Sequence, residues 1–187
     1  MLEIEGLIPR ASVVVVVVDV QEKLFRYILD KDNIQANLVK LIDFCRRLDI
    51  PLIVTEQYPK GLGTTIPEMQ EALGPEYRPY AKTVFSCFGS EEFVDALEES
   101  GADTMILVGI ETHICVMQTA LTALSSESYD VVVLADCVGT RSEQNHQLGL
   151  KRMRDEGAVI SSMEMFFYEM LQEAKTEDHE RVFDLLK

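Results

Sequence analysis

The sequence lacks the features that would place a protein in a membrane or outside the cell. Its longest purely aliphatic run, Val13–Val18, is far shorter than the ~20 apolar residues of a membrane-spanning helix, so no membrane association is expected. The first ten residues carry two glutamates and have neither the basic segment of a signal peptide nor the arginine-rich composition of a transit peptide. We therefore expect a cytoplasmic location, with mitochondrial association as an alternative.

Basic residues, cysteines and histidines are also scarce. The 17 basic residues are opposed by 32 acidic ones, and a formal net charge of −15 repels phosphate backbones, so nucleic acid is not an expected partner. The four cysteines show no CxxC spacing, and in a reducing compartment we expect no structural disulfide. The histidines, His113, His146 and His179, have no metal-ligand spacing, so neither a metal nor another cofactor is predicted.

The chain alternates between β-branched runs and helical apolar patterns. Its length and composition favour a single domain over residues 1–187. The valine run at residues 12–18 does not alternate with polar residues, which is typical of a parallel strand covered on both faces. We therefore predict a mostly parallel sheet with helices on both sides. Strands are expected at residues 12–18, 52–55, 104–108, 131–135 and 158–160, and helices at 34–48, 67–73, 91–100, 113–125 and 142–155.

Two details concern the predicted helices. Asp32 or Asn33 is expected to cap the helix at residues 34–48, and Cys45 lies on its apolar stripe, which indicates core packing. The segment SSMEMFFYEML at residues 161–171 is apolar nearly all round if helical. Such a helix is buried, either in the core of the domain or in a subunit interface, and the sequence leaves both open.

Polar or reactive residues follow several of the predicted strands. Asp19, Glu56, the segment 109–115 and the pair Asp136 and Cys137 all come at such positions. In open parallel sheets, ligands bind outside the carboxyl ends of the strands, so these residues are candidates for a functional site. Cys137 is followed by a loop rather than a helix start, and we interpret it as an inert core residue.

Cys115 is the candidate nucleophile, although a buried filler is the alternative. Thr112 is expected to cap the following helix, which would place Cys115 in the first turn, where the helix dipole lowers the pKa of a thiol. A nucleophile also needs a proton acceptor and a cationic neighbour. Asp19 and Lys82, the latter in a long Pro/Gly-rich connection between residues 56 and 90, supply these groups, although both residue types are common at caps and surfaces.

Three short motifs occur in the order found in one known family: VDVQ at residues 18–21, KTVFS at 82–86 and GIETHICV at 109–116. Together they resemble the isochorismatase-like cysteine hydrolases, over about residues 10–165. The segment TEQYPKGLG at residues 55–63 is similar to the subgroup of small isochorismatase domain-containing proteins.

The resemblance implies a three-layer α/β/α sandwich with a mostly parallel, Rossmann-like sheet, and a catalytic triad of Asp19, Lys82 and Cys115. It also implies a cis peptide bond between Ile110 and Glu111, and an oxyanion hole made by the backbone N–H groups of Glu111 and Cys115. Oligomers are common in the family, so we expect a homo-oligomer, a dimer or larger.

The sequence departs from two branches of the family. The histidine-containing metal cluster of nicotinamidases is missing from TEQYPKGLG, and true isochorismatases act without a thiol. We therefore interpret the chain as a metal-independent cysteine hydrolase that cleaves a small-molecule amide through a thioester. The alternatives are the mitochondria-associated ribonuclease label of some relatives, a non-catalytic interaction protein and a thiol redox sensor. The residues expected to line a substrate pocket are Gln21, Phe25, Tyr58, Phe85 and His113.

Overall fold

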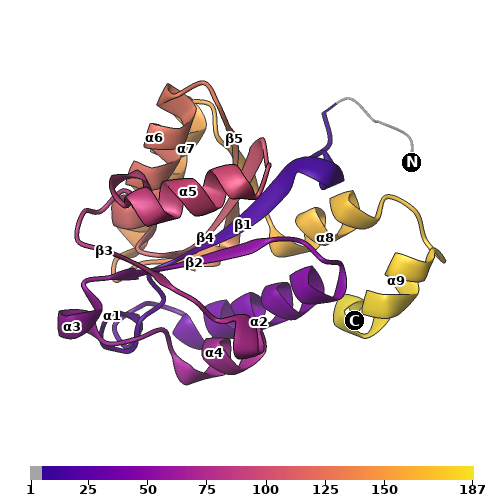
Figure 1. Ribbon diagram of the computed structural model, residues 1–187, viewed down its shortest axis with the longest axis horizontal. Coiled ribbons are helices and arrows are strands. Elements are labelled where there is room, and N and C mark those ends of the chain that lie inside the picture. Colours follow the sequence, from indigo (N-terminus) through magenta and orange to yellow (C-terminus); the bar gives the residue numbers. More distant parts are fainter. Residues whose placement is uncertain (1–5) are drawn as a thin grey trace.

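The computed structural model describes residues 6–187, without the side chain of residue 76, and a six-stranded sheet forms its centre (Figure 1). The strands are β1 (Val13–Val18), β2 (Leu52–Gln57), β3 (Tyr80–Lys82), β4 (Thr104–Ile110), β5 (Asp130–Gly139) and β6 (Val159–Ser161). Neighbouring strands pair in parallel in the order β3-β2-β1-β4-β5-β6. The chain thus moves outward from β1 to β3 and then returns to the other side of β1, so the strand order reverses between β1 and β4. Open parallel sheets bind ligands at such a reversal, at the carboxyl ends of the strands.

Helices cover both faces of this sheet, so the fold is the predicted three-layer α/β/α sandwich (Figure 1). The helices are α1 (Glu22–Phe25), α2 (Lys31–Arg47), α3 (Pro59–Leu62), α4 (Pro67–Leu73), α5 (Glu91–Glu99), α6 (Met117–Ser125), α7 (Glu143–Asp155), α8 (Met163–Leu171) and α9 (Glu177–Val182). One core lies between the sheet and α2, α4 and α8, and the other between the sheet and α5, α6 and α7. Over residues 6–187, the helices are too short or too polar to cross a bilayer.

The valine run of β1 is buried along its whole length, because β1 lies inside the sheet between β2 and β4 and helices cover both faces of the sheet. Val13, Val15 and Val17 belong to the core under α2, whereas the alternate valines belong to the core under α5 and α6. This division follows from the two-residue period of a strand. Complete burial of a valine side chain contributes about 1.5–3 kcal/mol of transfer free energy, so this strand anchors both cores.

Several predicted boundaries need correction. The helix α2 begins at Lys31, so its N-cap is Asp30 and not Asp32 or Asn33. The side chain of Asn33 instead donates a hydrogen bond of 2.6 Å to Asp30 Oδ1. The strand β2 continues to Gln57, which places Glu56 inside the strand rather than after it.

The strand β5 is also longer than predicted. It continues past a shift in its register with β4, between Leu107 and Gly109, and ends at Gly139. Asp136 and Cys137 therefore lie within the strand and do not follow its end. The side chain of Cys137 is fully buried in the core, in agreement with its interpretation as a packing residue.

The Pro/Gly-rich connection contains more regular structure than the sequence indicated. The predicted helix at residues 67–73 is confirmed as α4, but α3 and the edge strand β3 were missed. Lys82 is the last residue of β3 and pairs with Gln57 of β2. Lys82 is therefore held by the sheet rather than by a free loop.

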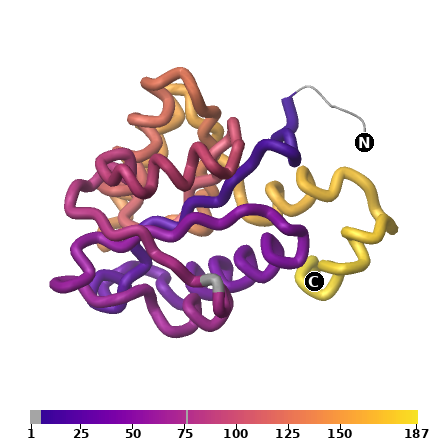
Figure 2. The backbone as a smooth tube through the Cα atoms, in the orientation of Figure 1, coloured from indigo at the N-terminus to yellow at the C-terminus, as the bar shows by residue number. Residues whose placement is uncertain are grey.

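The apolar C-terminal segment forms α8. The stacked ring of Phe167 lies 3.9 Å from that of Phe44 in α2, centroid to centroid, and Phe166 is buried beside it. Met165 and Tyr168 face outward and remain about half exposed. Figure 2 shows the chain after α8 turning back toward the end of α2. The segment is thus mainly part of the chain's own core, with a small apolar outer face.

Candidate active site

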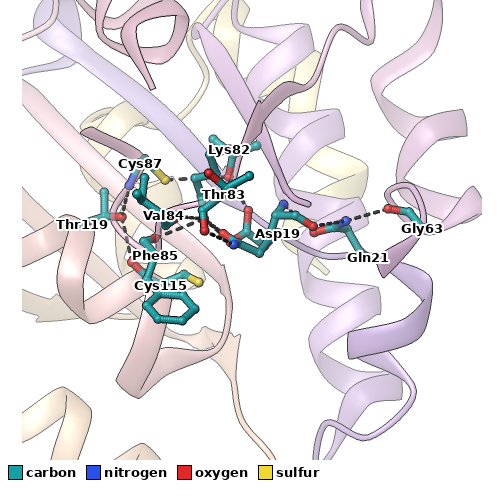
Figure 3. Close-up of polar contacts among 12 residues, drawn as sticks. Asp19, Gln21, Gly63, Lys82, Thr83, Val84, Phe85, Cys87, Cys115 and Thr119 are labelled. Atoms are coloured by element: carbon teal, nitrogen blue, oxygen red, sulfur yellow. Dashed lines mark hydrogen bonds and ion pairs between the residues drawn. The ribbon is translucent and has the colours of Figure 1, made fainter. Parts of the chain in front are cut away.

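The three residues of the predicted triad come from three different strand ends. Asp19 follows β1, Lys82 ends β3, and Cys115 lies in the turn after β4. The register aligns these ends, because Val18 pairs with Gly109 and Gln57 pairs with Lys82. The structure therefore brings all three side chains to the carboxyl edge of the sheet (Figure 3).

Asp19 and Lys82 form an ion pair that is closed off from solvent. Lys82 Nζ lies 2.6 Å from Asp19 Oδ2, and neither side chain has any exposed surface. The other carboxylate oxygen, Oδ1, accepts a hydrogen bond of 2.8 Å from Thr55 Oγ1. Asp19 has a φ of 52°, in the left-handed region that aspartate tolerates better than most residues. The carboxylate is thus fixed by donors on both oxygens.

The ammonium of Lys82 has further acceptors besides Asp19. It donates to Gln57 Oε1 at 2.8 Å and to the carbonyl oxygens of Phe85 at 3.1 Å and Val84 at 3.3 Å. Burial lowers the pKa of Lys82, but the charge and hydrogen bond of Asp19, together with the charges of the Cys115 and Cys87 thiolates, outweigh it, and the pKa is raised. The side chain therefore stays charged, and since these acceptors use its N–H groups, it acts on Cys115 through its charge.

Two buried glutamines connect this ion pair to the surrounding backbone. Gln21 donates to the carbonyls of Gln57 at 3.0 Å and Gly63 at 2.6 Å, and it accepts from the backbone N–H of Gln57 at 2.7 Å. The side chain of Gln57 in turn donates to the carbonyl of Thr83 at 2.7 Å. Gln21 therefore has a positioning role here, and Gln57 is a site residue that the sequence analysis missed.

The turn that carries Cys115 differs from the predicted helix start. The peptide bond between Ile110 and Glu111 is cis, and a π-helical turn, Thr112–Val116, leads into α6. The prediction of Thr112 as N-cap is wrong, because Glu111 precedes the turn and Thr112 is already part of it. Before the turn, Gly109 has a φ of 107°, and a Cβ atom there would lie 2.2 Å from the carbonyl oxygen of Val18. Only glycine fits at this position.

The thiol of Cys115 is nearly buried, and its ionisation differs from the sequence-based expectation. Burial and then the negative charge of Asp19 raise the pKa of Cys115, and a hydrogen bond with Asp19 acts in the same direction. The charge of Lys82 lowers this pKa but does not outweigh them. The predicted lowering is therefore wrong, because the sequence did not show how deeply the thiol is buried. At neutral pH Cys115 carries its proton and has a carboxylate beside it to receive it.

The side chain of Glu111 ties the turn to the end of β5. Its Oε2 accepts hydrogen bonds of 3.0 Å from both Thr140 Oγ1 and the backbone N–H of Arg141, whose guanidinium lies 3.1 Å from Oε1. Burial raises the pKa of Glu111, but the hydrogen bonds from Arg141 and Thr140 outweigh it, and the pKa is lowered. The carboxylate thus stays ionised and holds Glu111 in place, whose backbone N–H, with that of Cys115, would form the predicted oxyanion hole.

The residues expected to line a pocket have different surroundings. Phe25 is buried in the core on the α2 side of the sheet. Tyr58 and Phe85 are about half exposed, and Tyr58 borders a cavity of about 390 Å³ beside Lys82. His113 Nδ1 lies 3.1 Å from the hydroxyl of Thr140. Tyr58 and Phe85 are thus accessible near the triad, whereas Phe25 packs beneath the sheet.

Two threonines near the triad had no recognisable signal in the sequence. Thr55 binds Asp19, and Thr119 Oγ1 donates to the carbonyl of Cys115 at 2.7 Å. The hydroxyl of Thr119 also accepts the backbone N–H of Cys87 at 3.0 Å. Sequence reasoning missed the roles of these two threonines and of Cys87 because each contact joins different elements of the fold.

Within residues 6–187, no three side chains of histidine, cysteine, aspartate or glutamate are grouped to hold a metal ion. His146 Nδ1 contacts the hydroxyl of Thr112 at 3.0 Å, and burial lowers the pKa of His146. His146 therefore binds the turn that carries Cys115, and His113, which belongs to this turn, links it to Thr140.

Comparisons with known proteins show which family and which solved structures this chain resembles. The family model described as "Isochorismatase domain" matches residues 13–165. The isochorismatase domain-containing protein 2 of Danio rerio is 35% identical over 183 residues, which cover 97% of this chain and 90% of that protein. Among solved structures, the MAR1 ribonuclease from Caenorhabditis elegans is 34% identical with a TM-score of 0.89, and the match covers 97% of this chain and 92% of that one.

A second solved structure, YcaC from Pseudomonas aeruginosa with hexane-2,5-diol and covalent acrylamide, is 26% identical with a TM-score of 0.90. The match covers 98% of this chain and 91% of that one. The family model spans all strands of the sheet and every residue of the triad. The chain therefore belongs to the isochorismatase family, and this relationship supports a hydrolase.

Proposed function

We propose that this chain is a cysteine hydrolase that cleaves the C–N bond of a small amide without a metal or other cofactor. The observation that carries the proposal is the buried ion pair of Asp19 and Lys82, 2.6 Å apart, beside the thiol of Cys115. A neutral thiol next to an ionised carboxylate is arranged for proton transfer at the moment of attack.

In the proposed reaction, Asp19 takes the proton from Cys115 as the sulfur attacks the carbonyl carbon of the substrate. The negative charge on the carbonyl oxygen is stabilised by the backbone N–H groups of Glu111 and Cys115. Asp19 then gives its proton to the leaving amine, and the C–N bond breaks to leave a thioester on Cys115. Water, activated by the same carboxylate, cleaves the thioester, and the thiol recovers its proton. Lys82 keeps Asp19 in place and opposes the build-up of negative charge.

Two further observations support a small substrate and a reactive group at this site. The triad side chains are buried or nearly so, which leaves little room for a large molecule to reach the sulfur. The YcaC structure from P. aeruginosa contains covalent acrylamide, a small amide, in a protein of the same fold. We therefore favour small amides over polymers.

A screen of small amides and related acyl compounds tests the proposal, with Cys115→Ala and Cys115→Ser as inactive variants. Intact-mass measurement during turnover should detect the acyl group as a thioester on the wild-type protein. Cys137→Ala, which removes another buried thiol, is the matched control and should remain active. Full turnover by Cys115→Ala would contradict the proposal.

A ribonuclease is the second candidate, because a relative 34% identical to this chain is described as the MAR1 ribonuclease. The net charge of −15 opposes RNA binding, so we expect weak binding that disappears at moderate salt. Cleavage of labelled RNA by highly purified protein, lost in Cys115→Ala, would favour the ribonuclease over the amidase. A protein with neither activity would instead be an interaction protein.

Assembly and organisation remain predictions. The half-exposed Met165 and Tyr168 on α8 give the chain an apolar outer face, and we propose that it contributes to a homo-oligomer. Light scattering at micromolar concentration should give a mass above the 21.1 kDa of one chain. A single domain over residues 1–187 and a cytoplasmic location are part of the same proposal.

A further inference from the structure

A second thiol, that of Cys87, is connected to the carboxylate of the triad. Cys87 is fully buried, and its sulfur lies 3.7 Å from Thr55 Oγ1. Thr55 gives its own hydroxyl hydrogen to Asp19 Oδ1 at 2.8 Å, so the thiol of Cys87 is the donor to Thr55. The carboxylate of Asp19 acts on Cys115 closely enough to raise the pKa of its thiol, and Cys87 reaches the same carboxylate through one hydroxyl.

The backbones of the two cysteines are also joined. The N–H of Cys87 donates to Thr119 Oγ1 at 3.0 Å, and this hydroxyl donates to the carbonyl of Cys115 at 2.7 Å. Figure 3 shows both sulfur atoms between Thr119 and the pair of Asp19 and Lys82 in this view. Both cysteines belong to the core under α5 and α6. The two thiols therefore lie in one polar cluster on the same side of the sheet.

The same charges act on both thiols. Burial and the charge of Asp19 raise the pKa of Cys87 to about 11, while Lys82 acts in the opposite direction, as it does on Cys115. The charge of a Cys87 thiolate also raises the pKa of Cys115, and the charges of both thiolates raise the pKa of Lys82. Cys87 is thus a protonated thiol with its own route for proton loss, through Thr55 to Asp19.

We infer that Cys87 is a resolving thiol for Cys115, so that a peroxide converts the two residues into a reversible disulfide that blocks the site. In the first step, the sulfur of Cys115 attacks one oxygen of hydrogen peroxide and gives its proton to Asp19. The O–O bond breaks, the departing hydroxide takes this proton, and a sulfenic acid and water form. In the second step, the sulfur of Cys87 attacks the sulfur of Cys115, and its proton passes through Thr55 to Asp19. The S–O bond breaks, and the departing hydroxide takes the proton from Asp19 to leave as a second water. The thiols are oxidised and the peroxide is reduced, and a dithiol restores both cysteines.

The inference rests on the activation of Cys115 by Asp19 that the proposed function requires, but its readout needs no substrate. The other two cysteines supply a matched control. Cys45 and Cys137 are fully buried in the core on the opposite face of the sheet, and burial is the main cause that raises the pKa of each. The charge of Cys45 also raises the pKa of Cys137, so these two thiols influence each other without a triad beside them. They test whether nearness of two buried thiols alone is enough for a disulfide to form.

The experiment treats the reduced protein with a small molar excess of hydrogen peroxide near neutral pH and measures its intact mass. The remaining thiols are then alkylated before peptide mapping. Intact mass should fall by two hydrogens, and unreduced peptide mapping should join the peptides of Cys87 and Cys115. Dithiothreitol should restore the original mass. In Cys87→Ser, which keeps a polar group beside Thr55, Cys115 should instead gain two or three oxygens that dithiothreitol does not remove. Cys45→Ala should behave as the wild type does.

Identical oxidation products in the wild type and in Cys87→Ser, or a disulfide between Cys45 and Cys137, would overturn the inference. If Cys87→Ser unfolds, Cys87→Ala gives the same comparison with a smaller side chain. A disulfide that forms in a protein with no turnover of any amide would contradict the proposed hydrolysis and leave this inference standing. Turnover of an amide, with oxidation that does not depend on Cys87, would support the proposed hydrolysis and contradict this inference.

Discussion

Replacing Lys82 with methionine would leave the carboxylate of Asp19 buried without its counter-ion. The two side chains are completely buried and lie 2.6 Å apart, and methionine fills the space of the lysine stem while it removes the ammonium. Removal of one member of a buried ion pair costs about 3–5 kcal/mol, because the other charge is left uncompensated. Lys82 also holds Gln57 and two backbone carbonyls, so we expect a loss near the upper end of this range.

Urea unfolding measures this loss. With a slope of about 2 kcal/mol per M, a loss of about 5 kcal/mol lowers the midpoint by about 2.5 M urea. The matched control is Lys151→Met, which removes an exposed ion pair with Asp155 on α7. Because exposed pairs contribute little, this variant should lose no more than about 0.5 kcal/mol.

The double variant isolates the ion pair itself. Asp19→Asn removes the uncompensated charge, so it should recover part of the stability lost in Lys82→Met, with a coupling free energy of about 2 kcal/mol or more. Two results would refute the reasoning. One is a loss below about 1 kcal/mol for Lys82→Met, and the other is a double variant whose loss equals the sum of the two single losses.

Three other outcomes are expected. Gly109→Ala should lower the free energy of unfolding by about 3 kcal/mol or more, because its Cβ would clash with the carbonyl of Val18 at a positive φ. Gly101→Ala is the control: this position also has a positive φ but open space around it, so thermal unfolding should show a loss of about 1–2 kcal/mol. Asp19→Asn should shift the pH profile of Cys115 alkylation by iodoacetamide to lower pH, because the charge that raises the pKa of this thiol is gone. Amide turnover should fall ~10²–10⁴-fold, because the residue that accepts the thiol proton is missing. An unchanged alkylation profile would contradict the placement of Asp19 beside Cys115. Exhaustive chelation should leave turnover intact, and a loss that zinc restores would refute metal independence.

The sequence predicted the fold well because its strongest signals are local. An uninterrupted valine run and the alternation of strands with amphipathic helices are properties of neighbouring residues, and they led to the parallel sheet and its two helical layers. The edge strand β3 was missed because its three residues form a strand only through pairing with β2. A short edge strand has too few residues to show a period.

The site was only partly predictable, because many of its contacts join residues that are far apart in the sequence. The motifs identified Asp19, Lys82 and Cys115, and the structure brings these residues together. The surroundings of the thiol were not visible, so the effect of the helix start was overestimated and that of burial was overlooked. Gln57 entered the sequence analysis only as part of a subgroup motif, because its contact with Lys82 depends on the register of two strands.

Because Lys82 ends the edge strand β3, the ion pair of Lys82 and Asp19 exists only while β3 is paired with β2. Edge elements open with a smaller free energy than the whole domain, so detachment of β3 would separate the ammonium from the carboxylate while both hydrophobic cores stay intact. Heat or denaturant would then inactivate the protein before the sheet melts. The amide hydrogen exchange of Tyr80, Ala81 and Lys82 would report the fraction of molecules that have an assembled site, independently of global unfolding.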